Sequence, residues 1–308
     1  MNVRPFDSLR TDRHPQPRAF LVIAALVVAF AVVGCGATST SIPPGGSPSP
    51  TAAPNDDGTT IDHGTGATDV LFRFEEGGGF VPMDFFTTQA PLFTLYGDGT
   101  VIFRDNSQSV PAQPDPGVIA QVPFQTVRFD EAAIQAFLRH ALADSGLGVA
   151  RASYRPGNIA DAPTAVFTID AGGVKKVVSV EALGMDTSQG PDAPILKALA
   201  ALGEQVRAYG SAVNGETTWI PSRWRGVLVE DSAGAHGAWP WKDIAPSDFA
   251  IPAGNDAPQF PIRTMTPAEA ALLGLSNVDG GFSGLGLTGP DSKAYRFSLR
   301  PILPDERF

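Results

Sequence analysis

The 308-residue chain has a single cysteine, Cys35, so no disulfide can form within it and no multi-cysteine metal site is possible. It also lacks an apolar run long enough to cross a bilayer. The run Ala19–Val33 has fifteen residues, whereas a spanning helix needs roughly 20. Positive charge is scarce: 22 Lys and Arg stand against 32 Asp and Glu, a formal net charge of −10. This balance argues against a nucleic-acid partner, because phosphate binding needs clustered basic residues.

The composition nevertheless suits a folded protein. Hydrophobic residues make up 43% of the chain, which is enough for a packed core and excludes general disorder. The length allows one large core or two small ones.

The amino-terminal region is typical of a signal peptide. Residues 1–18 are polar with a net positive charge, the apolar run Ala19–Val33 follows, and Gly34-Cys35 comes directly after it. The sequence Val32-Val33-Gly34-Cys35 resembles the bacterial lipobox, although Val rather than Leu stands at its first position. The resemblance implies that residues 1–34 are removed and that Cys35 carries a diacylglycerol. The open alternative is an uncleaved transmembrane anchor with an incidental cysteine.

The lipid would place the protein on the extracytoplasmic face of the cell membrane, because two acyl chains give stable anchoring where one is marginal. Residues 35–66 are rich in Gly, Ser, Thr and Pro and predict a semi-extended tether, in which His63 is expected to be solvated. Residues 67–214 then predict a folded domain. Residues 215–308 predict a β-rich portion that either completes this domain or forms a second one.

The folded region predicts an α+β fold, an antiparallel sheet built of hairpins with helices packed on one face. Two β-rich runs flank Gly97-Asp98-Gly99, and two more flank residues 170–173, as in β-hairpins. Asp130 is placed to cap a helix with an apolar stripe, and Asp192 to cap a second helix over residues 193–209. A capping box, Thr266 to Glu269, predicts a short third helix.

No catalytic, cofactor or metal motif emerges. Residues 284–289 match the letters GxGxxG, but Pro290 and Asp291 follow instead of a helix, so a flexible loop is the better interpretation. His140 and His236 lack a second ligand at zinc spacing. Glu75 and Glu76 are adjacent in an expected strand and should point to opposite faces, so they do not form an acid–base pair.

All four tryptophans fall within a short stretch: Trp219, Trp224, Trp239 and Trp241. Tryptophan often anchors interfaces, which makes this stretch the first candidate for a binding surface. The opposing and favoured interpretation is that these rings fill the core of the carboxyl-terminal part.

Five segments carry a resemblance to a family of uncharacterised lipoproteins of actinobacteria and similar GC-rich bacteria. They are Glu76–Pro82 (EGGGFVP), Phe93–Ile102 (FTLYGDGTVI), Asp161–Ala165 (DAPTA), Glu181–Gly184 (EALG) and Arg300–Glu306 (RPILPDE). The resemblance implies a location and a fold, and it assigns no catalytic residues.

Two classes of function stay open. The first is a non-enzymatic binding module, anchored in the membrane by its lipid, for a cell-envelope protein or ligand. The second is an extracytoplasmic hydrolase whose site is assembled only in the fold. A cleft that unites His236 with acidic and hydroxyl side chains would favour the hydrolase. A flat patch with exposed tryptophan would favour binding.

Overall fold

The computed structural model describes residues 60–79, 88–112, 117–155, 159, 161–185, 190–253, 260–276 and 278–307. The chain divides into two units, Met1–Asn55 and Asp56–Phe308, and every described residue belongs to the second. The expected signal peptide, lipobox and Cys35 therefore lie outside the described residues. Within the described part, no helix is both long and apolar enough to cross a membrane.

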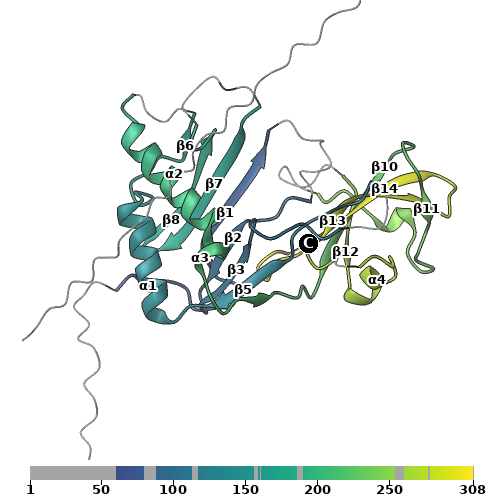
Figure 1. Cartoon of the computed structure of the whole chain (residues 1–308), viewed down its shortest axis with the longest axis horizontal. Coiled ribbons are helices and arrows are strands. Elements are labelled where there is room, and N and C mark those ends of the chain that lie inside the picture. Colours follow the sequence, from purple (N-terminus) through teal and green to yellow (C-terminus); the bar gives the residue numbers. More distant parts are fainter. Residues whose placement is uncertain are drawn as a thin grey trace, which may run out of the picture. The chain divides into compact units, whose positions relative to one another are not determined.

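The larger sheet has eight strands and is antiparallel except at one edge, where the first two strands are parallel. Its order is β6 (Ser153–Tyr154), β8 (Val174–Glu181), β7 (Pro163–Ala171), β1 (Val70–Gly78), β2 (Phe93–Tyr96), β3 (Thr100–Arg104), β5 (Phe124–Arg128) and β9 (Thr217–Thr218). Together with the helices this confirms the α+β fold (Figure 1).

The two predicted hairpins are present as the pairs β2–β3 and β7–β8. In the first turn, the Asp98 carboxylate accepts hydrogen bonds from the backbone N–H and the hydroxyl of Thr100 at 3.0 Å. Gly99 has φ +87°, and a Cβ there would lie 2.3 Å from the carbonyl oxygen of Phe129. Only glycine suits both the positive φ and this close approach.

Helices cover one face of this sheet (Figure 1): α1 (Glu131–Arg139), α2 (Ala193–Arg207) and the short α3 (Tyr209–Ala212). Asp130 caps α1 as predicted, accepting from the N–H of Ala133 at 2.8 Å. The stripe of α1 reaches the sheet through Phe137, whose ring centre lies 5.0 Å from that of Phe72 on β1.

The predicted cap of α2 is wrong. Asp192 makes no capping hydrogen bond, and its carboxylate instead pairs with Arg151. Competition from a nearby guanidinium, which sequence spacing does not reveal, accounts for the difference. Pro194 lies in the first turn of α2, where its missing N–H costs nothing.

The second sheet has six strands and contains most of the carboxyl-terminal portion. Its path is β11 (Gly237–Ala238), β13 (Phe282–Thr288), β14 (Ala294–Pro301), β10 (Trp224–Glu230) and β12 (Ile262–Met265), with β4 (Ile119–Ala120) pairing to β13. The segment that was expected to be a flexible loop, residues 284–289, is mostly strand β13. It leads to another strand and not to a helix, so the dinucleotide mechanism has no structural basis here.

The expected boundary at residue 214 does not separate the two sheets. Strand β9, which follows it, joins the larger sheet, whereas β4, which precedes it by almost a hundred residues, joins the smaller one. Residues 215–308 are thus part of the same unit as the hairpins.

The end of the chain ties the two sheets together. Arg300 on β14 forms two hydrogen bonds with the Glu306 carboxylate, at 2.8 and 2.6 Å. The neighbouring Asp305 accepts from Arg73 on β1 at 2.6 Å and from the Tyr96 hydroxyl on β2 at 2.8 Å. We call the segment from Arg300 to Glu306 the C-terminal clasp.

Residues 60–66, which were expected to belong to the tether, contact the folded unit. Ile61 exchanges two hydrogen bonds with the Gln135 side chain of α1, at 2.8 and 2.9 Å. His63, expected to be solvated, has a side chain only 5% exposed and lies 3.2 Å from a Glu131 oxygen. Burial alone would lower the pKa of His63, but the Gly64 carbonyl and the Glu131 carboxylate together raise it.

Replacing Asp305 with Ala tests the C-terminal clasp. The change removes the shared acceptor of Arg73 and Tyr96 and leaves a largely buried guanidinium without its ion pair. We expect urea unfolding of the purified full chain to show a loss of about 3 kcal/mol. Asp170→Ala is the control, because its pair with Lys175 is exposed to solvent and should contribute little to stability. Equal losses in the two variants would contradict the role of the clasp.

Candidate functional site

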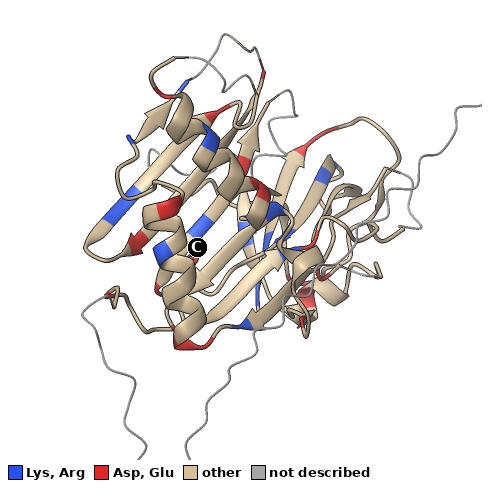
Figure 2. Cartoon of the chain, turned by 60° about the vertical axis from the view of Figure 1, so that its left-hand side comes forward, with Lys and Arg blue, Asp and Glu red and all other residues tan. Residues whose placement is uncertain are grey.

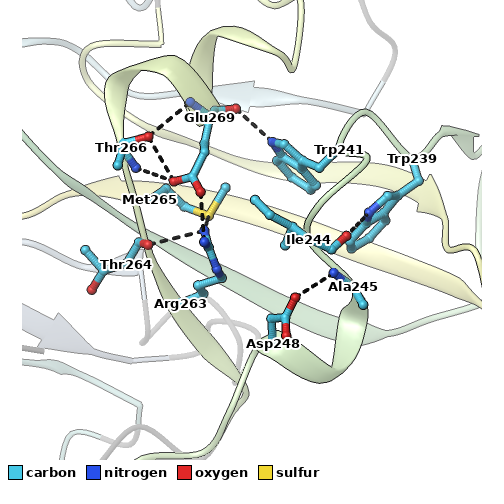
Figure 3. Close-up of polar contacts among 10 residues, drawn as sticks. All are labelled: Trp239, Trp241, Ile244, Ala245, Asp248, Arg263, Thr264, Met265, Thr266 and Glu269. Atoms are coloured by element: carbon cyan, nitrogen blue, oxygen red, sulfur yellow. Dashed lines mark hydrogen bonds and ion pairs between the residues drawn. The ribbon is translucent and has the colours of Figure 1, made fainter.

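The tryptophan stretch is built into the core of the smaller sheet. Trp224 and Trp241 are each 4% exposed and belong to one buried cluster with Phe297, and Trp239 packs against the same cluster. Figure 3 shows how both indoles of the Trp239-Pro240-Trp241 turn are anchored. The Trp239 N–H donates to the carbonyl of Ile244 at 2.6 Å, and the Trp241 N–H donates to the carbonyl of Glu269 at 2.8 Å.

This burial removes Trp224 and Trp241 from the candidate binding surface, since a ring so deeply enclosed offers no area to a partner. Trp219 is half-buried and meets Phe124 edge to face, with ring centres 6.0 Å apart. Trp224 and Trp241 thus pack with Phe282 and Phe297 in the core of the smaller sheet, in agreement with the core interpretation.

A serine–histidine–aspartate arrangement occurs on the π-helical turn His140–Asp144 that follows α1. One ring nitrogen of His140 lies 3.2 Å from a carboxylate oxygen of Asp144, and the other lies 3.3 Å from the hydroxyl of Ser145. The distances resemble those of a hydrolase triad, but the exposure is reversed. Ser145 is 3% exposed, while the Asp144 side chain is 70% exposed. A nucleophile must reach its substrate, and this hydroxyl is enclosed.

His236 is not part of any described cleft. Its Nε2 lies 3.0 Å from the backbone carbonyl of Asp231, and the residue does not line the pockets around Glu75, Asp69 and Pro246. The same residues contain no group of three or more His, Cys, Asp and Glu side chains that could hold a metal ion.

A polar concavity lies between the two sheets, and we call it the Glu75 pocket. Its volume is about 530 Å³, and segments far apart in the sequence contribute to it. Residues from β1, β7 and the approach to β2 line one side, and residues from β10, β14 and the C-terminal clasp line the other: Glu75, Glu76, Gly77, Gly78, Gln89, Ala90, Thr164, Val166, Arg225, Arg300 and Glu306.

The alternation of β1 gives its two glutamates different surroundings. Glu76 points to the helix-covered face, where Arg207 of α2 donates to both of its oxygens, at 2.7 and 2.5 Å. Glu75 points to the other face and into the polar pocket. This confirms the expectation that the two side chains diverge.

Burial sets the electrostatics of the pocket. It raises the pKa of Glu75, because loss of solvent disfavours the carboxylate more than Arg73 and Arg300 favour it. Burial, with a smaller contribution from Arg300, lowers the pKa of Arg225 to about 10. Arg300 itself is held by Glu306 and by the carbonyl of Gln89, to which its Nε donates at 2.5 Å.

Searches of family models, of curated proteins and of solved structures found no match for the chain.

Sequence reasoning missed the Glu75 pocket because its lining comes from five separate places along the chain. The one available signal was the pair Glu75-Glu76, since a charged residue on each face of a central strand is unusual. Cys35 and the lipobox residues Val32, Val33 and Gly34 lie outside the described residues.

The ion pair beside the tryptophans yields a pH-dependent prediction (Figure 3). Arg263, whose guanidinium lies 2.8 Å from Glu269, and the cap at Thr266 lower the pKa of Glu269 to about 2. The carboxylate therefore stabilises the fold fully above pH about 4.5, and this contribution disappears as the pH falls towards 2.

Glu269→Gln keeps the side-chain size and removes the charge. We expect it to lower the free energy of unfolding by about 1 kcal/mol at pH 6 and to have progressively less effect as the pH falls through 2. Denaturant titrations of both proteins across this range measure the difference. Glu230→Gln, which affects an exposed ion pair with Lys293, should leave the free energy of unfolding at pH 6 nearly unchanged. If the loss of unfolding free energy in Glu269→Gln stayed the same as the pH is lowered, the stabilising role of the Glu269 charge would be refuted.

Proposed function

We propose that the chain is a bacterial lipoprotein, anchored through Cys35 on the extracytoplasmic face of the cell membrane, whose folded unit is a non-enzymatic binding module. The anchor is supported by the sequence alone: a fifteen-residue apolar run, too short to span a bilayer unaided, ends at the only cysteine. The segment between Cys35 and the first described residues would hold the folded unit away from the lipid surface.

The binding role is supported chiefly by the Glu75 pocket. A concave site with a few convergent polar groups is the usual form of a ligand site. Here the polar groups come from both sheets, and none of the described arrangements supplies an accessible nucleophile with its base. The partner would be a cell-envelope protein or a small ligand.

The acidic balance of the chain supports a partner other than nucleic acid. In the view of Figure 2, Lys and Arg are scattered among acidic residues and form no continuous basic strip. Backbone phosphates would therefore meet no clustered positive charge on this side of the molecule.

Membership of the actinobacterial lipoprotein family belongs to the same proposal. Four of the segments that carry the resemblance contribute to the C-terminal clasp or the pocket: Glu76–Pro82, Phe93–Ile102, Asp161–Ala165 (through Thr164) and Arg300–Glu306. Glu76 of the first segment lines the Glu75 pocket, and Tyr96 of the second bonds to Asp305 of the C-terminal clasp. Arg300 belongs to the clasp and also lines the pocket.

An extracytoplasmic hydrolase is the second candidate, and the arrangement of His140, Asp144 and Ser145 is the observation that favours it. The enclosure of the Ser145 hydroxyl counts against it.

Cys35→Ser tests the anchor. Serine cannot form the thioether to diacylglycerol, so the variant should incorporate no clickable fatty acid and should persist as the longer precursor. Gel mobility and intact-mass analysis of the membrane fraction measure both effects. Normal labelling of the variant, or a wild-type product that retains Met1, would refute the lipoprotein assignment.

A fluorophosphonate probe separates the two functions. We expect no labelling of the purified full chain, because the Ser145 hydroxyl is enclosed and lines none of the described pockets. Labelling that disappears in Ser145→Ala and persists in Ser283→Ala would establish the hydrolase instead.

A further inference from the structure

The Glu75 pocket contains three polar side chains whose hydrogen-bonding groups have no partner among the described residues. They are the carboxylate of Glu75, the amide of Gln89 and the hydroxyl of Thr164, and each residue is half-buried. None of their side-chain atoms is among the fully enclosed unpaired atoms of the described residues, and all three residues line the pocket. Buried and half-buried polar groups in native proteins are nearly always paired, so three open ones in one pocket call for a ligand or water.

The register of the sheet brings these groups together. Glu75 lies opposite Val166, and Gly77 lies opposite Thr164, so Glu75 and Thr164 share the face that the helices leave uncovered. Gln89 fills the space above Gly77, where a Cβ would lie 2.4 Å from the amide oxygen Oε1. Glycine at this position therefore allows the amide to reach the pocket.

The charges of the pocket favour a cation. Arg300 is already neutralised by Glu306, and each of its three nitrogens donates a hydrogen bond. Arg225, on the opposite side, also has an interaction of its own. Glu76 is paired with Arg207, which leaves Glu75 as the carboxylate of the pocket without an ion pair.

The number of acceptors points to a guanidinium rather than an ammonium group. Two oxygens of Glu75, the amide oxygen of Gln89 and the hydroxyl of Thr164 offer four acceptors for a planar group with five N–H bonds. An ammonium group has only three donors. Val166 and Ala90 would contact the aliphatic stem of such a ligand.

We infer that the Glu75 pocket binds a guanidinium group, held by a bidentate pair with Glu75 and by hydrogen bonds to Gln89 and Thr164. This inference rests on the proposed binding function and names its ligand class. The guanidinium could belong to free arginine or to an arginine side chain of an envelope protein, and the chemistry at Glu75 is the same.

Calorimetric titration of the purified, detergent-solubilised full chain tests the inference. The probes are free L-arginine, N-acetyl-arginine amide as the side-chain mimic, and N-acetyl-citrulline amide as the neutral isostere. We expect at least one arginine probe to bind and the citrulline probe to bind at least tenfold more weakly. Preference between the two arginine probes identifies the source of the group.

Two variants locate the site. Glu75→Gln should weaken binding of the arginine probe at least tenfold, and Thr164→Val should weaken it severalfold. Glu230→Gln, outside the pocket, should bind as the wild type does. Because Glu75 has no ion pair to lose, Glu75→Gln should melt at the same or a higher temperature, which a structural role would not allow.

The outcomes are decisive. Binding that is unchanged in Glu75→Gln, or equal for the citrulline probe, would overturn the inference. Binding of inorganic phosphate to the pocket in place of the arginine probes would also overturn it, yet would leave a binding module intact. The anchor is tested separately by Cys35→Ser, so failure of one claim does not disguise failure of the other.

Discussion

The pairing of Arg300 with Glu306 is the contact on which the relation between the two sheets depends. Arg300 is 4% exposed, so its charge is tolerated only because a carboxylate meets it at two points. The same guanidinium reaches back to the carbonyl of Gln89, which precedes β2 of the larger sheet. One side chain of the smaller sheet is thereby bonded both to the end of the chain and to the larger sheet. The Glu75 pocket lies where these elements meet.

A fold that neutralises Arg300, Arg73 and Arg207 with carboxylates leaves Glu75 without such a partner. This is costly, because a carboxylate removed from water loses hydration that no neighbour replaces. Proteins retain groups of this kind mainly where function requires them, at some expense of stability. The contrast with Ser145 is instructive: that hydroxyl has good hydrogen-bond geometry but no access, whereas Glu75 has access but no partner. A ligand can therefore pair with the Glu75 carboxylate, whereas it cannot reach the Ser145 hydroxyl.

Local sequence chemistry predicted much of the fold. The turn at Asp98-Gly99, the cap at Asp130 and the capping box at Thr266 depend on residues within a few positions of one another, and all three are present. Where partners come from distant segments, the predictions failed. Asp192 bonds to Arg151 instead of capping α2. Ile61, expected to lie in the tether, is hydrogen-bonded to Gln135 of α1.

The candidate site escaped prediction for the same reason. Its residues are brought together by pairing between sheets, and the sequence marks no relation between Glu75 and Arg300. The tryptophans illustrate the same limit, since four large rings close in sequence are compatible with a surface or a core, and the favoured core interpretation holds for Trp224 and Trp241. Proximity along the chain is good evidence for a turn or a cap and poor evidence for a binding site.

The side chains of β1 point alternately to the two faces of the sheet, and this is the strongest constraint on which residues enter the Glu75 pocket. Phe72 and Phe74 are fully buried against the helices, and this fixes the face on which each following side chain emerges. Glu76 must then meet Arg207, and Glu75 must enter the polar pocket. A slip of one residue in the pairing of β1 with β7 would exchange the two glutamates and expose both phenylalanines. The hydrophobic core therefore determines which of two chemically identical neighbours is left open to a ligand.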